Sequence, residues 1–172
     1  KVGIEVLKSG GNAVDAAIAS QLALAVVYPG AGNIGGGGFM VAHLKNGKNI
    51  TLDYREMAPA KASRDMYLDS NGKPQMNLSQ DGHLACGVPG TIAGLFASLK
   101  YAKLPFKQLI QPAINLAEKG FAISASQATD LNDLKKEFLQ LNTSAVVFVK
   151  DQPWKKGDIL VQKDLANTLK RI

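Results

Sequence analysis

The sequence predicts an α+β fold, in which a β-hairpin near the front is followed mainly by helices. The hairpin prediction rests on two apolar segments, residues 39–44 and 50–54, joined by a turn that contains Asn46-Gly47. The helical prediction rests on capping residues, glycines and prolines that bound several apolar segments. Because a hairpin pairs its strands antiparallel, a doubly wound parallel sheet is not expected.

Two helices are expected before the hairpin. Residues 2–8 should form the last turns of one helix, which Gly10-Gly11 ends. Asn12 is a good N-cap for the next helix, and Asp15 falls at its third position, where a carboxylate suits the positive helix end. Residues 13–27 are apolar almost all round, so this second helix is expected to be buried.

Behind the hairpin, residues 60–76 are expected to form a polar connection. The further elements that the sequence predicts are helices over residues 91–102, 106–119 (interrupted or re-initiated at Pro112), 124–141 (with a capping box of Ser124 and Gln127) and 163–172, a short strand over 145–149 and a loop over 153–158.

The length of 172 residues is typical of one domain. We therefore expect residues 1–172 to form a single domain, with the buried helix and the hairpin in residues 1–60 and a mostly helical part in residues 87–172. Hydrophobic residues make up 46% of the chain, which indicates a folded rather than a disordered protein. The longest apolar run, residues 13–27, is too short and too often interrupted by polar residues to span a bilayer.

Several functional classes are not favoured by the composition. The net charge is +6, but the basic residues are spread along the chain without interleaved aromatic residues, so nucleic-acid binding is not expected. The single cysteine, Cys86, cannot form an internal disulfide, and a buried structural role is expected for it rather than that of a nucleophile. His43 and His83 lie far apart without other candidate ligands, so no metal site is predicted.

Four consecutive glycines, residues 35–38, lead directly into the first predicted strand. Glycine has no Cβ, so something must press against this segment that a side chain would block. Residues 30–35 also match G-x-G-x-x-G, and Asp53 lies at about the spacing of a ribose-binding acid. However, these glycines follow a helix and lead into a strand, the reverse of a dinucleotide-binding fold, so that function is not favoured.

Arg55 follows the second predicted strand. A planar guanidinium can hold a carboxylate through two parallel hydrogen bonds, with a geometry that lysine cannot copy. The alternative is a surface arginine that is paired with Asp53 or Glu56. The residue pattern by itself leaves both interpretations open.

Short motifs are spread across essentially the whole chain: residues 10–17 (GGNAVDAA), 34–40 (IGGGGFM), 54–59 (YREMAP), 87–91 (GVPGT), 111–113 (QPA), 120–121 (GF) and 157–162 (GDILVQ). In these segments, and in their order, the chain resembles the large subunit of the γ-glutamyltranspeptidase family. Each segment is weak evidence alone, and together they are highly specific.

The resemblance implies an N-terminal-nucleophile hydrolase with a four-layer αββα sandwich, of which this chain is an incomplete part. In that family a precursor cleaves itself into two subunits. The N-terminal threonine of the small subunit then attacks the γ-glutamyl amide of substrates such as glutathione, with its own α-amine as general base. Water, an amino acid or a peptide takes the acyl group from the resulting acyl-enzyme. No cofactor is implied.

The arginine of the family's Arg-Glu-x-Ala-Pro motif falls on Arg55, and the resemblance implies that this residue binds the α-carboxylate of the γ-glutamyl group. No catalytic residue is expected in this chain, because no segment resembles the small subunit that would be its partner. The chain alone is therefore expected to be inactive and to expose a sheet face that the small subunit covers. Family membership also implies export to the periplasm or the cell surface.

Two alternatives remain open at this point. One is a related acylase, such as a cephalosporin acylase, which an activity screen with other acyl amides would separate from a γ-glutamyltranspeptidase. The other is a nonenzymatic module that binds a carboxylate or a partner chain. A reading frame that continues past Ile172 to a threonine-led small subunit would argue against that module.

Overall fold

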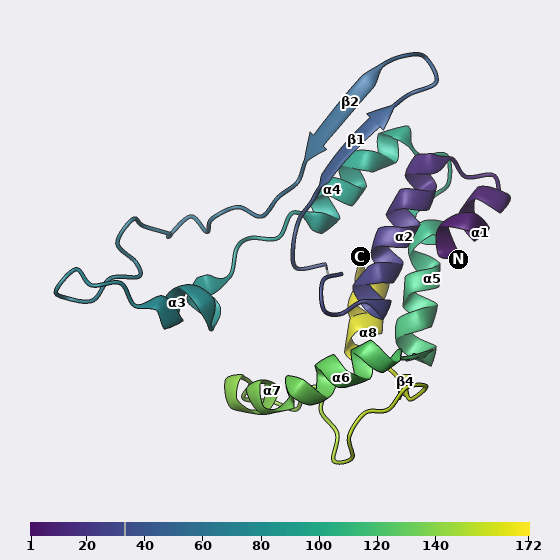
Figure 1. The fold of residues 1–172 in the computed structure, drawn as a ribbon. Helices are drawn as coiled ribbons and strands as arrows, with labels where there is room; N and C mark the ends of the chain where they lie inside the picture. Colours follow the sequence, from purple (N-terminus) through teal and green to yellow (C-terminus); the bar gives the residue numbers. More distant parts are fainter. Residues whose placement is uncertain (33) are drawn as a thin grey trace. The chain divides into compact units, whose positions relative to one another are not determined.

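The structure of the chain is a computed structural model that describes residues 1–32 and 34–172. These residues divide into two compact units (Figure 1). The helical unit contains residues 1–32 and Leu95–Ile172, and the hairpin unit contains Ile34–Gly94. The single domain expected over residues 1–172 stays a prediction.

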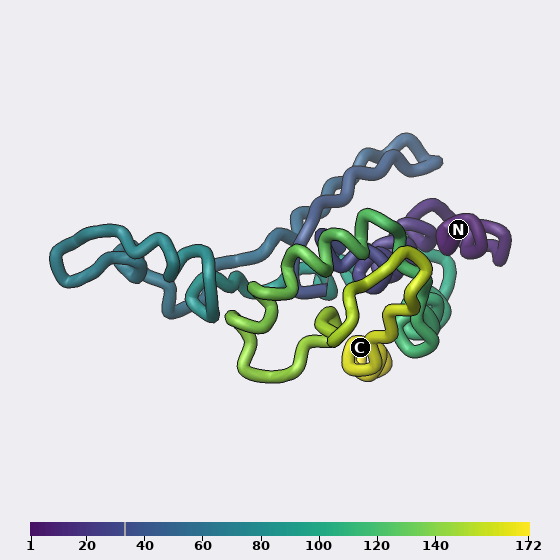
Figure 2. The backbone as a smooth tube through the Cα atoms, turned by 60° about the horizontal axis from the view of Figure 1, so that its bottom comes forward, coloured from purple at the N-terminus to yellow at the C-terminus, as the bar shows by residue number. Residues whose placement is uncertain are grey.

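Helices form the core of the helical unit: α1 (Val2–Lys8), α2 (Ala13–Val27), α5 (Phe106–Lys119) and α8 (Lys163–Arg171). Helix α2 packs against α1 and α5, and α5 also packs against α8 (Figure 1). Figure 2 views α8 almost end-on, with α5 beside it. Large apolar side chains from three of these helices are almost fully buried: Ile18, Leu22, Val26, Leu109 and Leu169.

Helix α2 begins as the sequence predicts. Asn12 caps it, and a capping box with Asp15 forms at its first turn. The Asp15 carboxylate is fully buried and also accepts hydrogen bonds from the backbone N–H groups of Lys103 and Leu104, at 2.9–3.1 Å. Burial raises the pKa of this carboxyl, but hydrogen bonds from the Asn12, Leu104 and Lys103 backbones hold the pKa below its ordinary value.

Two glutamines complete the other end of α2. Gln162 donates from Nε2 to the Val26 carbonyl at 2.8 Å, and Gln127 donates from Nε2 to the Val27 carbonyl at 2.7 Å. The last carbonyls of a helix have no partner within the helix, so side chains from elsewhere must satisfy them when they are buried. These bonds connect the end of α2 to α6, which contains Gln127, and to the start of α8, which Gln162 precedes.

Pro112 lies inside α5, which is one continuous helix of 14 residues, so the predicted interruption at Pro112 is wrong. A proline removes one backbone hydrogen bond and normally disturbs a helix interior. Here Ile110, two residues before the proline, and Ala113, directly after it, are buried, and α5 packs against both α2 and α8. Tertiary packing of the apolar face therefore maintains the helix through the proline.

The predicted helix over residues 124–141 is two helices, α6 (Ala125–Asp133) and α7 (Lys135–Leu141), which meet at Leu134. The capping box of Ser124 and Gln127 forms as predicted. A short antiparallel pair, β3 (Phe121–Ala122) and β4 (Ile159–Leu160), lies beside a second apolar cluster of Ile123, Ala128, Leu131 and Leu160.

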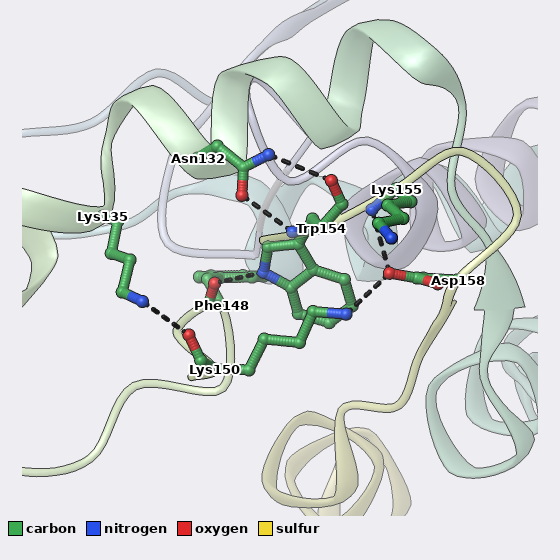
Figure 3. A network of polar contacts seen from close by, with 7 residues as sticks. All are labelled: Asn132, Lys135, Phe148, Lys150, Trp154, Lys155 and Asp158. Carbon is green, nitrogen blue, oxygen red and sulfur yellow. Dashed lines mark hydrogen bonds and ion pairs between the residues drawn. The ribbon is translucent and has the colours of Figure 1, made fainter. Parts of the chain in front are cut away.

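Residues 145–149 are irregular, so the predicted short strand is wrong. The Phe148 side chain packs against the second apolar cluster, and its carbonyl accepts a hydrogen bond from Trp154 Nε1 at 2.7 Å (Figure 3). Asn132 makes two bonds with the Trp154 backbone, accepting from its N–H at 2.8 Å and donating to its carbonyl at 3.0 Å. Side chains thus hold this loop in place of a strand partner.

The hairpin unit contains β1 (Phe39–His43) and β2 (Asn49–Asp53), which pair antiparallel around the predicted turn. Gly47 adopts a positive φ of 82° at this turn, a conformation that suits glycine. A long connection follows and carries the short helices α3 (Met76–Gln80) and η1 (His83–Ala85). Helix α4 (Thr91–Ser98) begins in this unit and ends in the helical unit, where η2 (Leu99–Tyr101) continues it.

The mixture of helices with two small antiparallel sheets confirms the α+β prediction. The four-layer αββα sandwich stays a prediction. None of the helices in residues 1–32 and 34–172 combines the length and the apolar character that crossing a membrane requires.

Candidate functional site

Arg55 lies directly after the antiparallel ladder of β1 and β2. Phe39 pairs with Asp53, and backbone hydrogen bonds of 3.0 Å and 3.4 Å extend the pairing to Gly38 and Tyr54. Side chains alternate between the two faces of a strand. Phe39, Asp53 and Arg55 therefore share one face of the hairpin, and Tyr54 belongs to the other.

The segment that carries Arg55 packs directly on the glycine run. A Cβ on Gly37 would lie 2.6 Å from the Tyr54 carbonyl oxygen and 2.7 Å from the Arg55 Cα. A Cβ on Gly38 would lie 2.8 Å from the Tyr54 ring, whereas one on Gly35 would meet nothing within 4 Å. The prediction that something presses against the glycines is thus confirmed for Gly37 and Gly38, and the contacting segment is the one that directly follows β2.

Two further glycines enclose Tyr54 from the start of α4. A Cβ on Gly90 would overlap the Tyr54 carbonyl oxygen, and a Cβ on Gly94 would overlap the Tyr54 ring. The Gly36 carbonyl accepts hydrogen bonds from the N–H groups of Gly90 at 2.9 Å and Thr91 at 3.0 Å, which satisfies donors at the first turn of α4. The backbone that precedes Arg55 is therefore held closely on two sides.

The Arg55 side chain is 67% exposed. Its backbone N–H donates to Asp53 Oδ1 at 3.0 Å, which fixes the chain direction after β2. The guanidinium carbon lies 5.9 Å from the centroid of the Phe39 ring, and Nε lies 3.8 Å from Glu56 Oε2. Because an exposed ion pair contributes little to stability, another carboxylate can replace Glu56 at low cost in free energy.

The residues after Arg55 form one wall of a cavity of about 230 Å³. Met57 and Val88 pair through two backbone hydrogen bonds of 3.1 Å and 2.8 Å, which bring the two sides of the cavity together. The residues that line it are 56–59, 84–87, Ala62, Met66 and Tyr67.

The other candidate residues of the sequence do not join Arg55 in a catalytic group. Cys86 is exposed, so the expectation of a buried structural cysteine is wrong; it follows η1 in a loop whose residues are mostly exposed. His43 Nδ1 lies 2.7 Å from Asn49 Oδ1 at the hairpin surface, and His83 lies in η1. Across residues 1–32 and 34–172, no three His, Cys, Asp or Glu residues gather as a metal ion would require.

The G-x-G-x-x-G match over residues 30–35 includes Asn33, which lies outside the described residues. Helix α2 ends at Val27 before this match, and β1 begins at Phe39 after it. The glycine segment thus follows a helix and leads into a strand, as predicted. A dinucleotide-binding turn needs the opposite order, a strand followed by a helix.

The sequence-based prediction missed two residues that surround Arg55, namely Phe39 and Tyr54. The signal for Phe39 was present, because the Asn46-Gly47 turn sets the register in which Phe39 is a diagonal neighbour of Arg55. No comparable signal connects Tyr54 with Gly94, since that contact depends on where α4 packs.

Comparisons with known proteins cover the whole chain. A family profile described as Gamma-glutamyltranspeptidase matches residues 1–172. The glutathione hydrolase proenzyme of Escherichia coli is 49% identical over 175 residues, and the match covers all of this chain and 30% of that protein. The chain thus spans less than a third of this curated relative's length.

Among solved structures, the gamma-glutamyltranspeptidase of Helicobacter pylori matches with a TM-score of 0.95 and 53% identity, over 99% of this chain and 50% of that chain. A more distant match is the cephalosporin acylase of Bacillus halodurans, with a TM-score of 0.83 and 26% identity, over 99% of this chain and 33% of that chain.

Proposed function

Since the chain belongs to the gamma-glutamyltranspeptidase family, we propose that it is the front part of the large subunit of a γ-glutamyl acyltransferase and hydrolase. The full protein cleaves the γ-glutamyl amide of glutathione and related compounds. This chain supplies Arg55, whose guanidinium binds the α-carboxylate of the γ-glutamyl group.

The observation that carries this proposal is the exposed guanidinium on a rigid backbone. A carboxylate accepts two parallel hydrogen bonds from a guanidinium, and the ion pair that Arg55 makes within the chain uses Nε at 3.8 Å. The contacts of Gly37 and Gly38 with residues 54 and 55 hold the backbone before a ligand arrives. Such preorganisation reduces the entropy that binding costs.

In this proposal the reacting groups come from the small subunit. The hydroxyl oxygen of its N-terminal threonine attacks the γ-carbonyl carbon, and the hydroxyl proton passes to the α-amine of the same threonine. The amine then gives the proton to the leaving nitrogen as the carbon–nitrogen bond breaks. Arg55 holds the far end of the substrate, so that the γ-carbonyl meets the nucleophile in a fixed orientation.

The small subunit is also the proposed partner of the hairpin. Phe39 and Val41, whose side chains share one face of β1, are 62% and 80% exposed. Exposed apolar side chains on a two-stranded sheet support the expectation that another chain covers this face and completes the αββα sandwich. We further propose that the assembled protein works in the periplasm or at the cell surface, and that this chain alone is inactive.

The test is the substrate preference of the full-length protein. We expect it to hydrolyse γ-glutamyl p-nitroanilide much faster than 4-aminobutanoyl p-nitroanilide, which differs from it only by lacking the α-carboxylate. Equal values of kcat/KM for the two anilides would contradict a carboxylate-binding site.

The match to a cephalosporin acylase supports a second candidate function, the cleavage of another acyl amide. Turnover of glutaryl amides without turnover of the γ-glutamyl anilide would favour that acylase. If the processed protein cleaves none of these amides, a nonenzymatic binding module becomes the better interpretation.

A further inference from the structure

Phe39 is the aromatic neighbour of the proposed carboxylate-binding arginine. The two side chains come from opposite strands, with Phe39 directly across from Asp53 and diagonal to Arg55. Diagonal neighbours on one face of an antiparallel pair are within reach of each other when one is aromatic and the other long. The guanidinium carbon lies 5.9 Å from the ring centroid, within the range of a cation–π contact.

We propose that Phe39 is a positioning residue, whose ring holds the Arg55 guanidinium ready for the α-carboxylate of the substrate. This inference rests on the proposed function, because it assigns Phe39 a role only through Arg55. It goes beyond that function by naming a residue of the glycine-rich segment that acts on substrate affinity without touching the reacting atoms.

A ring is suited to this role because it attracts the cation without using its hydrogen-bond donors. A guanidinium has five N–H groups, and a carboxylate neighbour such as Glu56 competes for them with a substrate carboxylate. The negative face of an aromatic ring attracts the delocalised charge while the N–H groups stay available at its edge. Phe39 therefore restricts the motion of Arg55 without blocking its ligand.

The backbone of Phe39 is itself fixed. It is paired with Asp53 in the ladder, and its carbonyl accepts a hydrogen bond from the Tyr54 hydroxyl at 3.5 Å. The next residue towards the N-terminus, Gly38, pairs with Tyr54 and packs under its ring. The ring therefore extends from a strand whose position relative to Arg55 is set by the register.

The test is a double-mutant cycle in the full-length processed protein, with kcat/KM for γ-glutamyl p-nitroanilide as the readout. Phe39→Leu removes the ring but keeps an apolar side chain, and we expect it to lower kcat/KM by about two- to fivefold, mainly through a higher KM. Phe39→Tyr keeps a ring face and should restore activity to near the wild-type value. Leu139→Ala in α7 is the control at an apolar residue that is as exposed as Phe39, and it should leave kcat/KM unchanged.

The second half of the cycle places Phe39→Leu in an Arg55→Ala background, where we expect no further loss. An equal loss in both backgrounds, or no loss in the wild-type background, would overturn the role of Phe39 and leave the proposed function of Arg55 intact. An Arg55→Ala variant that matches the wild type in kcat/KM would instead overturn the proposed function, and the role of Phe39 with it.

Discussion

Arg55 and Lys150 each lie over an aromatic ring, one in each unit, and their surroundings differ. In the helical unit, Lys150 Nζ lies 4.2 Å from the Trp154 ring centroid and 2.6 Å from Asp158 Oδ2 (Figure 3). In the hairpin unit, Arg55 lies 5.9 Å from the Phe39 centroid and 3.8 Å from a carboxylate oxygen of Glu56. The Lys150 side chain is 34% exposed and that of Arg55 67%.

Lys150 is therefore a charge that stabilises the fold, whereas the charge of Arg55 is accessible to a ligand. Asp158 accepts hydrogen bonds from both Lys150 and the Lys155 backbone. The cation and its carboxylate partner are therefore both engaged in contacts within the chain. These contacts hold the pKa of Asp158 below its ordinary value, chiefly through the Lys150 hydrogen bond. The Arg55 backbone is closely packed, whereas its side chain makes a 3.8 Å ion pair and a 5.9 Å ring contact. A residue that binds a ligand needs such a fixed backbone and an accessible side chain.

The largest expected effect concerns Arg55. Replacing it with alanine in the full-length protein should lower kcat/KM for γ-glutamyl p-nitroanilide by on the order of thirtyfold or more, because a charge-assisted contact of at least about 2 kcal/mol is lost. Arg55→Lys should recover only part of the activity, since an ammonium lacks the planar fork. Steady-state kinetics measures kcat/KM for both variants, on protein that has cleaved itself into its two subunits as the wild type does.

The control for that prediction is Arg64→Ala. Arg64 belongs to the same unit and its side chain is 96% exposed, with Nε 3.6 Å from Asp65. We expect this change to leave kcat/KM at the wild-type value. A loss of similar size in both variants would show that the effect belongs to net charge and not to the position of Arg55.

The fold and the site show where sequence reasoning succeeds. Short-range signals were sufficient for the hairpin turn, for the N-cap of α2, for the capping box of α6 and for the close packing on Gly37. The chemistry of Arg55 follows from its residue type, and its place at the end of β2 follows from the hairpin.

Contacts between distant residues explain what the sequence could not predict. Asp15 accepts hydrogen bonds from the N–H groups of Lys103 and Leu104, which lie 88 and 89 residues away in the sequence. No local sequence pattern predicts these bonds. Likewise, residues 145–149 have a strand-like pattern, but strand formation requires a pairing partner, and here Trp154 occupies the Phe148 carbonyl.

The second prediction tests whether the glycine packing sets the position of Arg55. Gly37→Ala should lower the stability of the protein by about 1–3 kcal/mol and also lower kcat/KM, because the new Cβ would displace the Tyr54 and Arg55 backbone. Gly35→Ala lies two residues away in the same glycine run with nothing within 4 Å, and it should change neither quantity. Equal effects of the two changes would refute a specific role for Gly37.

The third prediction concerns Asp15, whose buried carboxylate, like Lys150, forms its hydrogen bonds within the chain. Because its pKa in the folded state is lowered, its contribution to stability is present above the ordinary value of 3.8 and is lost as pH falls through the lower folded pKa. Asp15→Asn should destabilise the protein by about 1–3 kcal/mol at neutral pH, since its amide group would face backbone donors.

The measurement is the difference in thermal unfolding midpoint between the wild type and Asp15→Asn, followed from about pH 7 to about pH 3. We expect the difference to narrow as the wild-type carboxyl takes up its proton. A difference that stays constant over this range would mean that the charge of Asp15 does not stabilise the fold.

A smaller effect is expected at the loop of the helical unit. Asn132→Ala removes two hydrogen bonds to the Trp154 backbone and should lower stability by about 1–2 kcal/mol. Asn142→Ala removes one exposed bond to the Phe138 carbonyl and serves as the control, with a smaller loss. Neither change should alter kcat/KM, because no residue of this loop belongs to the proposed binding site.

The smallest effect, and the one that completes the comparison with Arg55, is expected for Lys150→Met. Methionine keeps an apolar chain over Trp154 but loses the cation and its bond to Asp158. A partly exposed ion pair adds little to stability, so the unfolding midpoint should fall less than for Asn132→Ala, while kcat/KM stays at the wild-type value. If Lys150→Met impaired turnover as Arg55→Ala does, then the presence of close partners within the chain would not distinguish a structural cation from one that binds substrate, and Arg55 would have no special place in the proposed site.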